Sequence, residues 1–80
     1  MSQDIAVDAE LDCTGIACPG PIGMTRGMID KIGIDQVLKV HTDDPAAEED
    51  ILRWALRTGH LVLKYEKNGN VLTFYIRRMK

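Results

Sequence analysis

The residue of this sequence best placed to do chemistry is Cys18, in the run LDCTGIACPGP at residues 11–21. It lies between a strand-like stretch and a stretch with helical spacing, and a residue before proline is disfavoured from helical backbone angles. Cys18 is therefore predicted at or just before the start of a helix, with Pro19 and Pro21 shaping the first turn. Free N–H groups and the positive dipole end of a helix stabilise a thiolate and lower a cysteine pKa from about 8.5. This pattern predicts a nucleophilic thiolate.

The stretch that leads to Cys18 is predicted to be a strand. Residues 5–13 alternate between apolar and polar side chains, and the apolar set on one side includes Val7 and Cys13. A period of two is typical of a strand with one buried and one wet face. After Cys18, apolar residues recur at three- and four-residue steps and predict a helix that ends at Gly33.

The next two elements are predicted to be a short strand and a well-specified helix. Residues 37–42 alternate again and predict the strand. Asp44 is a good N-cap, Pro45 suits the first helical position and Gly59 supplies the stop. Trp54 lies on the apolar stripe of this helix and is predicted to be buried.

The last part of the sequence is predicted to be a β-hairpin. Residues 60–66 and 71–77 alternate as strands around residues 67–70, which contain an Asn-Gly pair. The element order is therefore βαβαββ, in which a parallel strand-helix-strand unit is extended by antiparallel pairing. We predict an α+β fold with a single domain over residues 1–80. It is a two-layer α/β sandwich, a four-stranded mixed sheet covered on one face by two helices.

Composition excludes several function classes. A formal net charge of −2 gives no general attraction to nucleic acid or to an anionic membrane. No apolar run approaches the roughly 20 residues of a membrane-spanning helix, and the acidic first residues do not resemble a signal peptide. Two cysteines without an export signal are expected to be thiols in a reducing cytoplasm.

Four residues around Cys18 have expected roles. Gly15 belongs, with the two prolines, to the turn that carries the thiol. Met24 and Arg26 on the first helix are candidate partner contacts, and Arg26 is alternatively an electrostatic support for the thiolate. Asp43 is a further candidate contact, because its neighbour already caps the second helix and Asp43 has no such local duty.

The second cysteine, Cys13, continues the inward parity of its strand and is predicted to be part of the core. A disulfide between Cys13 and Cys18 is left open, although the spacing is not the usual redox spacing. A metal site is not expected, because His41 and His60 lack the spacing of a ligand pair.

A set of motifs in register resembles one family: Leu11-Asp12, Gly15, Cys18-Pro19-Gly20-Pro21, Asp43-Asp44-Pro45, Asp50-Ile51, Trp54 and Gly59-His60. The set extends over nearly the whole chain and is similar to the TusA/SirA family of small sulfur carriers. The resemblance implies the βαβαββ fold and a sulfurtransferase that carries a persulfide on Cys18, with no other cofactor. It also implies relay from a cysteine desulfurase or rhodanese-type donor to an acceptor protein. Destinations in the family include tRNA thiolation, molybdenum-cofactor enzymes and sulfur oxidation.

Two departures from the family pattern and two alternative functions accompany this interpretation. Residues 22–27 contain two glycines where many members carry bulky aliphatic residues, and Cys13 is an additional thiol. The alternatives are an interaction or regulatory module with a structural Cys18, and an RNA-binding domain of similar layout, as in a bacterial translation initiation factor. Against RNA stand the acidic balance and the lack of a basic-aromatic stripe. A carrier that offers one cysteine to successive partners is expected to work as a monomer.

Overall fold

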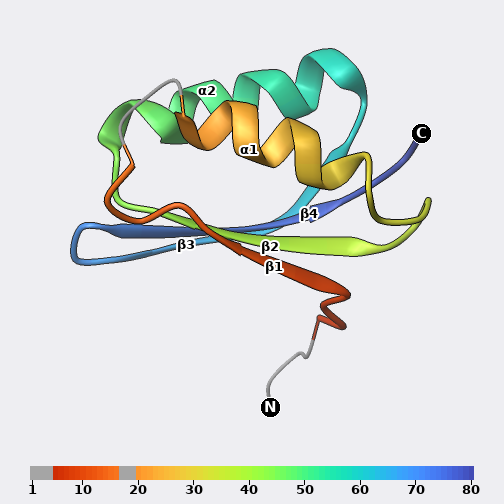
Figure 1. The fold of residues 1–80 in the computed structure, drawn as a ribbon, viewed down its shortest axis with the longest axis horizontal. Helices are drawn as coiled ribbons and strands as arrows, with labels where there is room; N and C mark the ends of the chain where they lie inside the picture. The colour runs from red at the N-terminus through yellow and green to blue at the C-terminus, as the bar shows by residue number, and fades with distance from the viewer. Residues whose placement is uncertain (1–4, 17–19) are drawn as a thin grey trace.

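The computed structural model describes residues 5–16 and 20–80 of the chain. In chain order, its elements are the following: β1 (Ala9–Asp12), α1 (Gly20–Ile29), β2 (Val37–Thr42), α2 (Pro45–Thr58), β3 (Leu61–Asn68) and β4 (Val71–Arg77). This order confirms the predicted βαβαββ arrangement (Figure 1).

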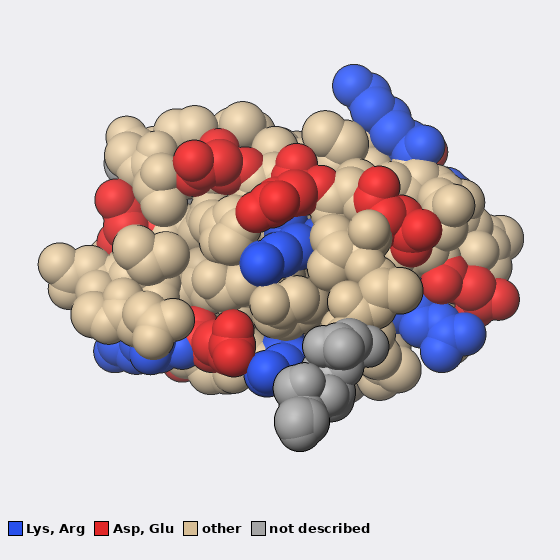
Figure 2. Space-filling model, turned by 90° about the horizontal axis from the view of Figure 1, so that it is seen from below, with Lys and Arg blue, Asp and Glu red and all other residues tan. Residues whose placement is uncertain are grey.

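The four strands form one mixed sheet in the order β1-β2-β4-β3. The pair β1–β2 is parallel, and β4 runs antiparallel to both β2 and β3. Both helices lie on the same face of the sheet and the opposite face is uncovered (Figure 1). On the uncovered face, acidic and basic side chains are interspersed rather than grouped by sign (Figure 2). The two-layer fold predicted from the sequence is therefore confirmed.

The second helix begins and ends where its capping signals predicted. The Asp44 side chain accepts a hydrogen bond from the Ala46 N–H at 3.0 Å, and Pro45 occupies the first helical turn. Gly59 ends the helix with a φ of 86°, a left-handed conformation that glycine adopts without a Cβ clash. Four residues of α2 are buried against the sheet: Ala47, Ile51, Trp54 and Ala55.

The core lies between the sheet and the two helices. Its members on β2 and β4 are fully or almost fully buried, and they alternate with residues on the uncovered face as the period of two requires. The largest fully buried side chains are Phe74, Ile29, Leu38, Ile51 and Ile76. Burial of this alternating set fixes the register of the strands, because a shift by one residue would expose it.

The first strand is shorter than predicted. Its pairing begins at Ala9, opposite Leu38, and Val7 is 39% exposed, so the prediction of a strand over residues 5–8 is wrong. The cause is its neighbour: β2 begins at Val37, and the Asp8 carboxylate accepts the Val37 N–H at 2.9 Å. A strand cannot extend its ladder where the partner strand has not begun.

Two further boundaries differ from the prediction. The first helix ends at Ile29 rather than at Gly33, and a turn follows in which Lys31 N–H donates to the Met28 carbonyl at 2.9 Å. The hairpin turn is Gly69-Asn70, because β3 continues to Asn68. Gly69 has a φ of 62°, which suits the first central position of a two-residue turn with glycine there.

No helix within the described residues is both long and apolar enough to cross a membrane.

Candidate functional site

The predicted site lies at one end of the sandwich. The parallel strands β1 and β2 both end there, α1 and α2 both begin there, and the turn between β3 and β4 reaches the same end (Figure 1, left). Cys18, Ala17 and Pro19 lie outside the described residues, as does the side chain of Pro21. The helix itself begins at Gly20, two residues after Cys18 in the sequence, and the placement of Cys18 at the helix start stays a prediction.

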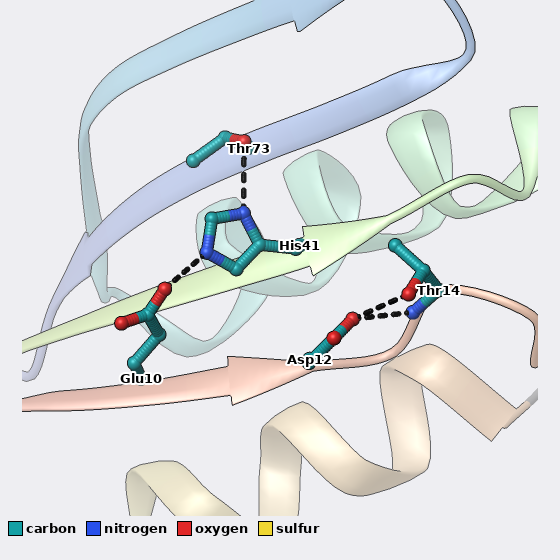
Figure 3. A network of polar contacts seen from close by, with 5 residues as sticks. All are labelled: Glu10, Asp12, Thr14, His41 and Thr73. Carbon is teal, nitrogen blue, oxygen red and sulfur yellow. Dashed lines mark hydrogen bonds and ion pairs between the residues drawn. The ribbon is translucent and has the colours of Figure 1, made fainter.

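The segment that leads toward Cys18 is held by hydrogen bonds on both sides. Cys13 N–H donates to the His41 carbonyl at 2.7 Å, which continues the parallel ladder by one residue. The Asp12 carboxylate then accepts from the N–H of Thr14 at 2.9 Å and from its hydroxyl at 2.6 Å (Figure 3). These two bonds lower the pKa of Asp12, with the hydroxyl making the larger contribution. The chain is thus fixed as it leaves the sheet.

The next bond joins this segment to the start of α2. Gly15 N–H lies 2.9 Å from Asp43 Oδ1 and 3.1 Å from Asp43 Oδ2, so one carboxylate receives the amide in a forked arrangement. Gly15 has a φ of 81°, a left-handed conformation that suits glycine. Gly15 lies in a turn with Thr14, and its role in the segment that carries Cys18 stays a prediction.

Asp43 has a local duty that the sequence did not indicate. It was singled out as a partner contact because no bond was expected for it, whereas the structure gives it the Gly15 amide. The two residues are 28 positions apart, and they meet because β1 and β2 are parallel neighbours whose following loops lie side by side. Asp43 remains exposed, and its contact with a partner stays a prediction.

Removal of the Asp43 carboxylate is expected to loosen this segment. Asp43→Ala leaves the Gly15 N–H without its acceptor, and we expect faster hydrogen exchange of that amide with a loss of about 1 kcal/mol or less in stability. Asp43→Asn is the matched control, because its amide oxygen still accepts. Nuclear magnetic resonance measures the exchange of Gly15 directly. Equal exchange rates in Asp43→Ala and the unaltered protein would contradict this role.

The other cysteine is unavailable as a surface nucleophile. Cys13 is 0% exposed, and its Sγ lies 4.0 Å from Met24 Sδ, beneath α1. Burial raises the pKa of Cys13, and the nearby charge of Asp12 raises it further. The prediction that Cys13 belongs to the core is confirmed.

Met24 and Arg26 both lie on α1 but differ in position. Met24 is 38% exposed, and its Sδ contacts the buried Sγ of Cys13, so its side chain extends from the core to the surface. Arg26 is exposed in the last turn of α1, about 9 Å along the helix axis from Gly20 at 1.5 Å per residue. It lines a hollow of about 200 Å³ between the two helices, together with Ile29, Asp30, Trp54, Thr58 and His60. Contacts of Met24 and Arg26 with a partner stay predictions, and the distance from the helix start favours that role for Arg26 over support of the thiolate.

A larger hollow adjoins Asp43. It has a volume of about 380 Å³ and is lined by Asp43, Pro45, Glu48, Lys67, Asn70 and Leu72. Asp43 precedes α2, Pro45 and Glu48 lie in its first turn, and the other three residues come from the hairpin at or near its turn. The hollow therefore lies beside the segment that leads to Cys18 and offers both signs of charge to a docking segment.

A polar cluster on the uncovered face was not predicted. His41 Nε2 lies 2.5 Å from Glu10 Oε2, and His41 Nδ1 lies 3.1 Å from Thr73 Oγ1 (Figure 3). Both ring nitrogens are thus engaged within the sheet. Among residues 5–16 and 20–80, no group of three or more His, Cys, Asp or Glu side chains is arranged to hold a metal ion.

Comparison with known proteins gives a consistent result. Residues 9–78 match the model of the family described as "Sulfurtransferase TusA". The chain is 35% identical over 71 residues to the putative sulfur carrier protein YrkI of Bacillus subtilis, covering 89% of this chain and 95% of that protein. It is 32% identical over 75 residues to the sulfur carrier protein TusA of Pseudomonas entomophila, covering 94% of each.

Two further comparisons concern length and fold. A putative sulfur carrier protein of Aquifex aeolicus is 38% identical over 76 residues, and the match spans 95% of this chain but 39% of that protein. The crystal structure of a SirA-like protein from Desulfitobacterium hafniense superposes with a TM-score of 0.77 at 22% identity, covering 90% of this chain and 99% of that chain. This last likeness shows the fold. Together with the family match over residues 9–78, the relatives establish that the chain belongs to the TusA family of sulfur carriers.

Proposed function

We propose that the chain carries sulfane sulfur as a persulfide on Cys18 and passes it from a donor protein to an acceptor protein. The observation that supports this most directly is the burial of Cys13. The sequence contains two cysteines, and Cys13 is 0% exposed with a raised pKa. In a sulfur carrier, Cys18 is therefore the thiol left to meet a partner.

The transfer conserves atoms and electrons without a cofactor. The Cys18 thiolate attacks the outer sulfur of a donor persulfide, a new S–S bond forms at Cys18, and the donor cysteine leaves as a thiolate. Handover is the same exchange with an acceptor thiolate as the nucleophile. No oxidant or reductant is consumed, because the sulfane sulfur moves as such. This makes the chain a sulfurtransferase by relay.

The helix that follows Cys18 supports the first step. α1 begins at Gly20 and is ten residues long, so its positive dipole end and free N–H groups lie next in the chain to Cys18. These groups favour a thiolate at neutral pH and remove the need for a general base. Consistent with that chemistry, His41 is engaged by Glu10 and Thr73 on the opposite side of the sheet.

The proposed partners are two proteins that meet the same end of the molecule in turn. The donor is a cysteine desulfurase or a rhodanese-type protein, and the acceptor belongs to tRNA thiolation, molybdenum-cofactor or sulfur-oxidation chemistry. The hollow beside Asp43 and the exposed part of Met24 border this end and suit docking of both. The cytoplasm is the proposed location, because its reducing conditions keep the receiving thiol free.

Sulfur loading of the unaltered protein tests this function. Incubation with a cysteine desulfurase and cysteine, or with a rhodanese-type donor and its sulfur source, is expected to add one sulfur atom, read by intact mass. Because a persulfide is labile to thiols, dithiothreitol should remove the added mass. Absence of the adduct with every competent donor would overturn the proposal and leave the interaction module as the better interpretation.

A further inference from the structure

The strand β3 forms an unpaired edge of the sheet. It bonds β4 on one side, and no described strand lies on its other side. The two-residue turn pairs Asn68 with Val71, and antiparallel pairs alternate between bonded and non-bonded. The pair next to the turn, Asn68 with Val71, is a hydrogen-bonded pair. Lys67 and Tyr65 therefore form non-bonded pairs with β4, and their backbone N–H and C=O groups point away from β4. Such an edge is ready to pair with another strand.

This edge is also apolar. Leu61, Leu63 and Tyr65 are 47%, 38% and 37% exposed. The Tyr65 side chain hydrogen bonds with Glu48 of α2, which raises the pKa of Tyr65 and places that side of α2 beside the strand. One helical turn after Glu48, Leu52 is 36% exposed. Tyr65 on β3 and Leu52 on α2 are therefore exposed apolar side chains on the helical side of this edge.

Two charged residues determine which strand fits this edge. Lys64 and Glu66 pair with Tyr75 and Thr73 of β4 and share one face of the sheet, with Lys64 Nζ 3.1 Å from Glu66 Oε2. A two-fold axis at Tyr65 would place Lys64 of each copy directly opposite Glu66 of the other. An axis moved by one residue would instead oppose Lys64 to Lys64 or Glu66 to Glu66. The strand is thus complementary to itself in one register.

We propose that β3 pairs with β3 of a second copy of this chain about a two-fold axis at Tyr65. The two sheets then become one continuous sheet with all helices on the same side. Four alternating charges form a ring on the uncovered face, and Tyr65 meets its symmetry mate on the helical face. The interface is isologous, so the same residues serve both copies.

The length of the edge limits the strength of this dimer. The register of β3 shifts between Val62 and Lys64, and the turn follows Asn68, so the regular stretch is short. The dimer should therefore be reversible. Because antiparallel pairing reverses direction, the hairpin turns and the neighbouring site ends point to opposite ends of the dimer. In the proposed register Leu63 of the second copy lies opposite Lys67, which lines the hollow beside Asp43, so self-pairing and docking at that hollow meet at Lys67. The dimer does not depend on the proposed function.

A charge-reversal experiment tests the register. Sedimentation equilibrium of the full chain from about 10 µM to about 1 mM should show a concentration-dependent dimer. Lys64→Glu and Glu66→Lys each place like charges in opposition and should weaken self-association about tenfold or more. An equimolar mixture of the two variants restores opposite charges across the axis and should restore the dimer. The double variant Lys64→Glu/Glu66→Lys should also dimerise.

Control measurements keep the outcomes distinct. Arg53→Glu on the exposed side of α2 changes charge equally and should leave the dimer intact. A monomer at every concentration, or a dimer that neither reversal weakens, would overturn the proposal. Variants that each weaken the dimer but fail to recombine would overturn the Tyr65-centred register. Sulfur loading of the same variants reports on Cys18 separately, so either proposal can fail alone.

Discussion

Replacement of Cys18 with serine is expected to abolish sulfur loading while the fold remains intact. Serine has a side chain of similar size, but it carries a hydroxyl in place of the thiol. It therefore offers no thiolate at neutral pH, and no persulfide can form. Intact mass after incubation with a competent donor measures the adduct, and circular dichroism measures the fold. We expect complete loss of the one-sulfur adduct and an unchanged spectrum.

Cys13→Ala is the matched control for this result. Cys13 is 0% exposed and its pKa is raised by burial, so its loss should leave the amount of adduct unchanged. The truncation removes one buried sulfur and should lower stability moderately without unfolding the domain. If Cys18→Ser still gains the adduct and loses it when Cys13 is also removed, Cys13 carries the sulfur and our assignment to Cys18 is wrong.

The second large effect concerns stability. Trp54→Ala is expected to lower the free energy of unfolding by about 3–5 kcal/mol, a large share of the total for a small domain. Trp54 is 4% exposed on the buried stripe of α2, and its ring centroid lies 5.3 Å from that of His60. Burial lowers the pKa of His60, and the charge of Arg78 lowers it further. Urea unfolding at low temperature measures the change.

Leu56→Ala provides a comparison on the same helix. Leu56 is 84% exposed, and truncation of a surface side chain usually changes stability by no more than about 0.5 kcal/mol. Both variants carry alanine at the substituted position of α2. The comparison therefore isolates the loss of a buried side chain from the loss of an exposed one. If both variants unfold at the same urea concentration, burial of Trp54 does not make the predicted contribution to the free energy of unfolding.

Local signals in the sequence were sufficient for several elements. The caps at Asp44 and Gly59 fixed both ends of α2, and the alternation of residues 37–42 gave β2 with its bounds. Burial of Cys13 followed from the parity of its strand. Each of these features depends on residues within a few positions of one another, where backbone geometry and side-chain period act directly.

Features that join distant segments were not predictable in the same way. The start of β1 depends on where β2 begins, and the bond between Gly15 and Asp43 spans 28 positions. The same holds for the contacts of His41 with Glu10 and Thr73, which come from three different strands. Periodicity assigns a residue to a face of a strand but does not specify its neighbour on the next strand.

By itself, the sequence determined the order of the elements, the buried sides of β2 and α2, and the choice of Cys18 as the thiol before a helix. Tertiary structure alone decided that Asp43 holds the Gly15 amide and that β3 is left as the open edge. The physical reason is that capping, turns and periodicity are short-range properties of the chain. Strand order and the meeting of loops are set by how the whole sheet buries its apolar face.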